Sequence, residues 1–165
     1  RFLLEYLPDR EKAISEMLRV CVPGGRVLLQ DLDGQLVWHY PCDEQLQGGI
    51  GRVLRRLSAT GFDPFVGRKL FSLARNAGLH NIEVRAESYH LIAGRIDDHN
   101  YNLWQLKLAI ALPAMAQALN NRAEAEALCD TFLAYLRRDD TLTYSVVFTV
   151  VGTKPGEEGS VDAHA

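Results

Sequence analysis

A helix that stops at a Pro-Gly-Gly turn and leads into an apolar strand is the feature that most restricts the fold of this chain. Apolar residues from Ile14 to Cys21 recur at i, i+3, i+4 and i+7, which predicts an amphipathic helix with Asp9 as its N-cap. Pro23-Gly24-Gly25 then ends that helix in a tight turn. The run Val27-Leu28-Leu29 lacks alternation, which predicts a strand covered on both faces, as in a parallel sheet. A helix, a turn and a buried strand make half of an α/β unit, so we expect an α/β fold.

The remaining pattern predicts further helices and two more strands. Residues 82–87 alternate apolar with charged side chains, which suits the edge strand of a sheet. Residues 142–150 alternate and are rich in β-branched side chains, so they form the strongest predicted strand. Because only a helical pair separates these strands, we expect them to pair antiparallel at the end of a sheet. The other predicted segments are a loop from Gly34 to Pro41, helices over 46–57, from Asp63-Pro64 to Gly78, over 101–119 and over 122–137, and a disordered tail over 155–165.

Composition excludes several classes of protein. The 165 residues are 47% hydrophobic and 24% charged, which is ordinary for a globular protein. A net charge of −3 argues against nucleic acid or an anionic membrane as the main partner. The apolar stretch over 103–119 contains Lys107 and Pro113 and is too short and polar for a membrane span. Three cysteines without a CxxC spacing predict free thiols in a reducing, cytoplasmic environment.

The first half of the chain resembles the class I S-adenosylmethionine-dependent methyltransferases. The resemblance is carried by an ordered set of segments: RFLLEYLPD at residues 1–9, MLRVCVPGGRVLL at 17–29, DPFVGRKL at 63–70 and AGL at 77–79. In that family an apolar run follows the fourth strand, and a helix and a Pro-Gly-Gly turn lead to the fifth strand. The similarity covers residues 1–90, and the final predicted strand fits the same pattern.

The resemblance implies a Rossmann-like sheet of strand order 3-2-1-4-5-7-6, whose seventh strand is antiparallel. This chain would supply strands five, six and seven, so residues 1–154 are expected to be the C-terminal part of a methyltransferase domain. The helical pair over 98–138 departs from the minimal family pattern and reads as an insertion before the last strand. No GxGxG motif follows a strand, so the half that grips the cofactor is expected upstream of Arg1.

The resemblance also implies cofactor contacts near the N-terminus. In the family, the loop after the fourth strand lines S-adenosylmethionine, and the corresponding residues here are Arg1, Phe2 and Leu4. Phe2 and Leu4 have an alternative role as core residues.

Residues that follow the Val27-Leu28-Leu29 strand are candidates for substrate binding, because ligands of open α/β sheets sit at the carboxyl ends of strands. These residues are Asp31, Asp33, Trp38 and His39. Each has a simpler alternative: the aspartates as turn formers beside Gly34, the tryptophan as a plug, and the histidine as a solvated loop residue. No metal site is expected, because Asp97-Asp98-His99 suits the cap of the following helix better than a ligand set.

Two functions fit these patterns. The first is a methyltransferase that uses S-adenosylmethionine on a small-molecule acceptor, with this portion inactive by itself. The second is a non-catalytic module that dimerises or scaffolds. A homo-oligomer would form through the helix over 101–119, which is apolar almost all round, or through the free edge of the Val27-Leu28-Leu29 strand. That edge should otherwise be covered by the N-terminal segment.

Overall fold

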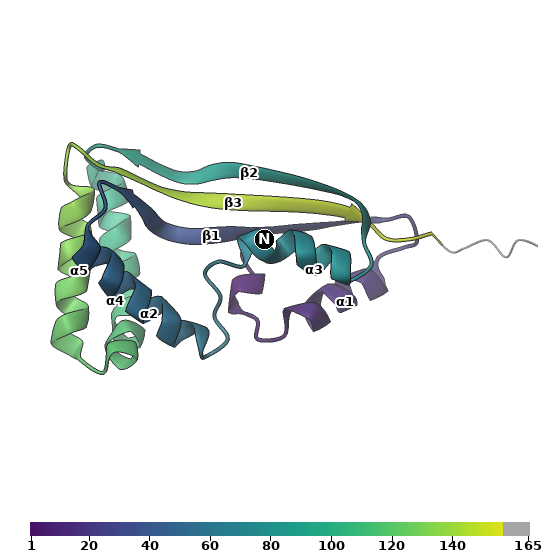
Figure 1. Ribbon diagram of the computed structural model, residues 1–165, viewed down its shortest axis with the longest axis horizontal. Helices are drawn as coiled ribbons and strands as arrows, with labels where there is room; N and C mark the ends of the chain where they lie inside the picture. Colours follow the sequence, from purple (N-terminus) through teal and green to yellow (C-terminus); the bar gives the residue numbers. More distant parts are fainter. Residues whose placement is uncertain (157–165) are drawn as a thin grey trace, which may run out of the picture.

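Three strands form one sheet in the computed structural model, which describes residues 1–156 (Figure 1). The strands are β1 (Arg26–Tyr40), β2 (His80–Ala93) and β3 (Leu142–Thr153), and their order is β1-β3-β2. β3 is antiparallel to both neighbours. The α/β class is therefore confirmed, as are the antiparallel pairing across the helical pair and the edge position of β2. The observed order β1-β3-β2 corresponds to the order that the resemblance implies for strands five, seven and six of a methyltransferase sheet. The assignment of these family strand numbers to β1, β3 and β2 stays a prediction.

The helices fall into two groups at the two ends of the sheet (Figure 1). The short turn η1 (Leu4–Tyr6), α1 (Arg10–Val20), η2 (Gly67–Lys69) and α3 (Leu70–Asn76) lie together at one end. The other group consists of α2 (Glu44–Ser58), α4 (Asp98–Leu119) and α5 (Arg122–Leu136).

Each group has its own hydrophobic core. The sheet core comprises Leu4, Ile14, Val27, Leu29, Val66, Leu70, Ala74, Leu79 and Val150. The bundle core comprises Leu36, Leu46, Val53, Ile96, Trp104, Met115, Ala125, Leu128, Cys129, Phe132, Tyr135 and Leu136. β1 contributes to both cores, so this strand connects the two halves of the molecule.

The N-terminal segment lies against the edge of β1 that β3 does not occupy. The backbone N–H of Phe2 donates to the carbonyl oxygen of Gln30 at 3.0 Å. The N–H groups of Leu4 and Glu5 donate to the Asp31 carboxylate at 2.9 and 3.4 Å. The segment thus contacts the middle of this edge, as expected from the need to cover an unpaired strand.

The predicted loop from Gly34 to Pro41 is wrong, because β1 continues to Tyr40. Asp33 pairs with Val146 and Trp38 with Tyr144, so the four residues between them leave the ladder as a bulge. Gly34 has φ +85°, a conformation that glycine adopts without strain, and its N–H donates to Pro64 O at 2.7 Å. This segment, residues 34–37, is called the β1 bulge below. The turn signal at Gly34 marks the bulge rather than the end of the strand.

Two further predictions also need correction. The strand at Val27-Leu28-Leu29 is not covered on both faces in the described structure, since Leu28 is 58% exposed. The helix predicted to open at Asp63-Pro64 begins only at Leu70. The Asp63 carboxylate does accept a hydrogen bond from Phe65 N, but the chain then approaches β1 at Gly67 before it turns into α3.

The helical pair occurs where the sequence predicts it. Asp97 caps α4 by accepting from Asn100 N at 2.9 Å, which confirms the predicted helix cap. Among residues 1–156, no group of three potential ligands is placed to hold a metal ion. α4 is less buried than its composition indicates, since Ile110 is 73% exposed. No helix in the same range is both long and apolar enough to cross a membrane. The tail predicted as disordered lies outside the described residues except for 155 and 156.

The close approach of η2 to β1 gives a test of the fold. A Cβ on Gly67 would lie 2.7 Å from the carbonyl oxygen of Leu32, a backbone atom that cannot move aside. We expect Gly67→Ala to lower the free energy of unfolding by about 1–3 kcal/mol in urea titrations. Gly48→Ala is the control, because nothing lies within 4 Å of its added Cβ in α2, and it should raise stability by about 0.5–1 kcal/mol. Equal stability of the two variants would contradict the contact.

Candidate functional site

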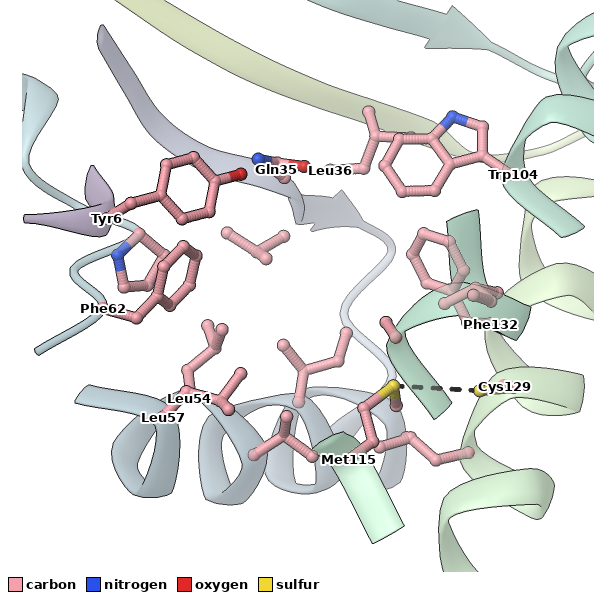
Figure 2. A pocket seen from close by; sticks show the side chains of 17 residues that line it. Tyr6, Gln35, Leu36, Leu54, Leu57, Phe62, Trp104, Met115, Cys129 and Phe132 are labelled. Carbon is pink, nitrogen blue, oxygen red and sulfur yellow. Dashed lines mark hydrogen bonds between the residues drawn. The ribbon is translucent and has the colours of Figure 1, made fainter. Parts of the chain in front are cut away.

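An apolar cavity of about 260 Å³ lies between the β1 bulge and the second group of helices (Figure 2). Gln35, Leu36 and Val37 of the bulge form one wall. The opposite wall comes from α2, and the helical pair α4 and α5 closes one end. Tyr6, from the first turn of the chain, lies at the other end. Segments far apart in the sequence therefore meet around one partly open cavity.

The end formed by the helical pair is aromatic and sulfur-rich. The rings of Trp104 and Phe132 meet edge to face with centroids 5.6 Å apart. The Cys129 thiol lies 3.9 Å from the Met115 sulfur, and burial raises the pKa of that thiol. No charged residue lines the cavity within the described part of the chain. These walls favour an apolar ligand body.

The other end of the cavity is polar. Figure 2 shows the Tyr6 hydroxyl directed toward the side chain of Gln35. The carboxylate of Glu5 lies close to both side chains and is buried, since Glu5 is only 1% exposed. Burial raises the pKa of Glu5 and the neighbouring Asp31 charge raises it further, while the polar groups of Tyr6 and Gln35 act in the opposite direction. Its Oε2 atom has no hydrogen-bond partner.

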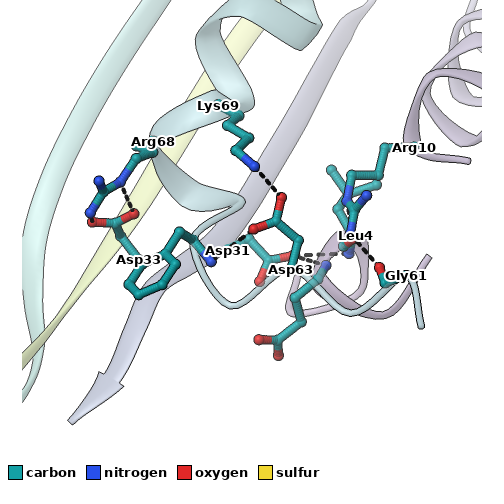
Figure 3. Close-up of polar contacts among 10 residues, drawn as sticks. Leu4, Arg10, Asp31, Asp33, Gly61, Asp63, Arg68 and Lys69 are labelled. Carbon is teal, nitrogen blue, oxygen red and sulfur yellow. Dashed lines mark hydrogen bonds and ion pairs between the residues drawn. The ribbon is translucent and has the colours of Figure 1, made fainter. Parts of the chain in front are cut away.

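Asp31 fixes the position of this polar end (Figure 3). Its carboxylate accepts from the N–H groups of Leu4, Glu5 and Leu32, so it holds the first turn against β1. Burial raises the pKa of Asp31, and these backbone hydrogen bonds lower it by less. Arg10 supports the same turn, because its guanidinium donates to the carbonyl oxygens of Leu4 and Gly61 at 2.9 and 2.6 Å.

The basic side chains near this network already have partners. Arg68 makes a two-point ion pair with Asp33, with distances of 2.6 and 2.7 Å. Lys69 pairs with Asp63 at 2.5 Å (Figure 3). Within residues 1–156, neither Glu5 nor Asp31 forms an ion pair with a basic side chain.

None of the predicted site residues lines the cavity. Leu4 is 4% exposed and belongs to the sheet core. The Phe2 ring meets the ring of Tyr89 with centroids 5.1 Å apart, and the Arg1 guanidinium lies over both rings. These three residues are therefore close in space but do not face the cavity.

The four predicted substrate residues lie along β1 and have internal contacts. Asp31 and Asp33 make the contacts described above, and the Trp38 indole N–H donates to Asp33 O at 3.0 Å. His39 is buried, its Nδ1 atom lies 3.2 Å from the Thr143 hydroxyl, and its ring packs on Tyr135. Burial lowers the pKa of His39 to about 4. It is thus a neutral, internal group at pH 7.

The sequence analysis missed Tyr6, Gln35 and Glu5. The signal present in the sequence is weak: Glu5 and Tyr6 interrupt an apolar run, and Gln35 follows the Gly34 turn signal. Nothing in the local pattern indicates that the first turn and the β1 bulge meet.

Comparisons with known proteins find similar chains among solved structures only. No family model matches the sequence, and no curated protein matches it. Among solved structures, one similar chain is Haemonchus contortus phosphoethanolamine N-methyltransferase 2, in complex with phosphomonomethylethanolamine and S-adenosylhomocysteine. The two share 16% identity with a TM-score of 0.41, and the match covers 94% of this chain but only 32% of the other.

Two histidines, the buried His39 and the partly buried His90, predict an acid-sensitive fold. Burial lowers the pKa of both His39 and His90 from 6.5 to about 4, so between these pH values the unfolded chain binds protons that the folded chain does not. Their contribution is fully present above pH 6.5 and is lost as the pH falls toward 4. For His39, the free energy of unfolding should fall by up to about 3 kcal/mol across that window.

Unfolding of His39→Asn, followed by circular dichroism from pH 7 to pH 4, should give a shallower pH dependence than the native sequence. The double variant with His90→Asn should be shallower still. Glu5 and Asp31 titrate in all three proteins, so the differences report on the histidines. Parallel pH curves would contradict the burial of these rings.

Proposed function

We propose that this chain is the C-terminal portion of an S-adenosylmethionine-dependent methyltransferase that acts on a small-molecule acceptor. The observation that carries the proposal is the partly open cavity of about 260 Å³, with apolar walls and one polar end. The sequence resemblance over residues 1–90 and the strand order β1-β3-β2 support it. The helical pair acts as a cover that belongs to the acceptor site.

Methyl transfer from a sulfonium is an in-line displacement, so its rate depends on how the acceptor is held. In this proposal the cavity walls orient the acceptor and exclude water, and the polar end fixes one end of the molecule. S-adenosylmethionine, when bound, supplies the methyl group. Residues 1–156 do not form a complete site for it, because Leu4 is buried in the sheet core and no glycine-rich loop follows a strand. We therefore propose that upstream sequence provides most of the cofactor contacts.

The three free cysteines fit a reducing compartment, and we propose the cytoplasm as the location. Cys129 is buried and Cys42 is exposed, so an oxidising environment would leave a reactive surface thiol.

Calorimetric titration with S-adenosylmethionine tests the function. The chain of residues 1–165 should show no measurable binding, while the full-length gene product that contains it should bind at least 100-fold more tightly. A metabolite screen with that product should then identify a methylated small molecule. Micromolar binding to residues 1–165 alone would contradict the division of the cofactor site, and a full-length product that neither binds nor methylates would contradict the function.

A non-catalytic dimerisation module is the second candidate, and one observation favours it. Leu103, Leu106 and Ile110 form a stripe along α4 and are 42%, 59% and 73% exposed. An apolar stripe at this spacing is typical of a helix that packs against a partner.

Sedimentation equilibrium distinguishes this candidate. If the stripe is an interface, the native chain should dimerise, and Leu106→Glu with Ile110→Glu should weaken the dimer by at least tenfold. Gln105→Glu, an exposed change on the same helix, is the control and should leave association unchanged. A native chain that stays monomeric at high concentration would exclude the module.

A further inference from the structure

The size of the cavity limits its ligand. A cavity of about 150 Å³ lined by apolar side chains accepts benzene in other proteins. The cavity here measures about 260 Å³, so it accommodates a molecule of roughly ten non-hydrogen atoms. Most of that molecule must be apolar, because Tyr6 and Gln35 provide the strong polar groups of the wall.

The polar end has a buried carboxylate oxygen without a partner. The side chains of Tyr6 and Gln35 line the cavity, and the Glu5 carboxylate lies next to both of them. Glu5 is 1% exposed, and within residues 1–156 its Oε2 atom has no hydrogen-bond partner. An ionised carboxylate only accepts hydrogen bonds, and the hydroxyl oxygen of Tyr6 and the amide oxygen of Gln35 can accept them too. The matching ligand group is a hydrogen-bond donor.

The charge of the buried carboxylates near the polar end determines which hydrogen-bond donor of a ligand fits best. Glu5 and Asp31 are two neighbouring buried carboxylates, and neither has a cationic partner among residues 1–156. Arg68 and Lys69 are engaged by Asp33 and Asp63, and Arg10 donates to backbone carbonyls. A ligand ammonium at the polar end would compensate this buried negative charge, whereas an anionic group would be repelled. The Tyr6 and Phe62 rings, with centroids 5.4 Å apart, add aromatic faces that attract a cation.

We propose that the cavity binds an apolar amine, with its ammonium group against Tyr6 and Gln35 in front of Glu5 and its hydrocarbon body toward Trp104 and Phe132. The proposal rests on the proposed function in one respect: it makes this amine the methyl acceptor of the site. Binding of the amine itself needs no cofactor, so it is measured separately from methyl transfer.

Three probes that differ only in their head group test the proposal on the full chain. These are 3-phenylpropylamine, 3-phenylpropan-1-ol and propylbenzene, each of about the size that the cavity holds. By calorimetry or NMR titration, the amine should bind at least tenfold more tightly than the alcohol, and the alcohol more tightly than the hydrocarbon. Equal affinities for the three probes would overturn the proposal.

Substitutions test whether Glu5 causes the preference for the amine probe. Glu5→Gln keeps the shape of the side chain and removes its charge, so the affinity for the amine should fall to that for the alcohol, and the affinity for the alcohol should change less than threefold. Gln105→Leu, an exposed change on α4 away from the cavity, should leave all three affinities unchanged. If Glu5→Gln retains the preference for the amine while its thermal unfolding is native-like, the assignment to Glu5 is wrong.

The outcomes separate this inference from the proposed function. Preferential amine binding by a protein whose full-length form neither binds nor uses S-adenosylmethionine supports the inference and contradicts the function. A full-length protein that methylates a metabolite while its cavity treats the three probes alike contradicts the inference alone.

Discussion

The buried carboxylate of Asp31 holds the first turn of the chain in place, and the cavity depends on that turn. A 3₁₀ turn at a chain terminus has N–H groups without internal partners, and Asp31 accepts two of them, from Leu4 and Glu5. This contact places Tyr6 at the end of the cavity. Because Asp31 is fully buried, removing its hydrogen bonds would leave a carboxylate in the interior without compensation. The same side chain therefore stabilises the fold and positions the candidate site.

The β1 bulge is the second determinant of the site. A regular strand would keep residues 34–37 in the ladder, whereas here Leu36 enters the bundle core and Gln35 faces the cavity. The N–H of Leu36 donates to the Ser145 hydroxyl at 2.7 Å, which replaces a ladder hydrogen bond that the bulge removes. One strand thus packs on α3 in its first half and lines a cavity in its second half.

The sequence predicted the elements better than the site. Helix α1, the helical pair and β3 follow from local periodicity and caps such as Asp9, because those signals depend on neighbouring residues alone. The bulge was missed because Gly34 gives the same signal for a turn that ends a strand and for one that interrupts it. The cavity was missed because Glu5, Tyr6 and Gln35 come together only through long-range contacts. The four residues proposed for substrate binding at the end of the first strand make contacts within the protein along β1. Their role in binding stays a prediction.

The two edge strands of the sheet, β2 and β1, differ in how readily they would pair with another strand. Glu83, Arg85 and Glu87 are exposed along β2, and charged side chains of this kind disfavour the docking of another strand. At the opposite edge, Gln30 of β1 accepts a backbone hydrogen bond from Phe2, so that edge takes a partner. The two edges of the sheet therefore differ: β2 carries charges that discourage another strand, while the edge of β1 beside the cavity is protected by the chain's own first turn.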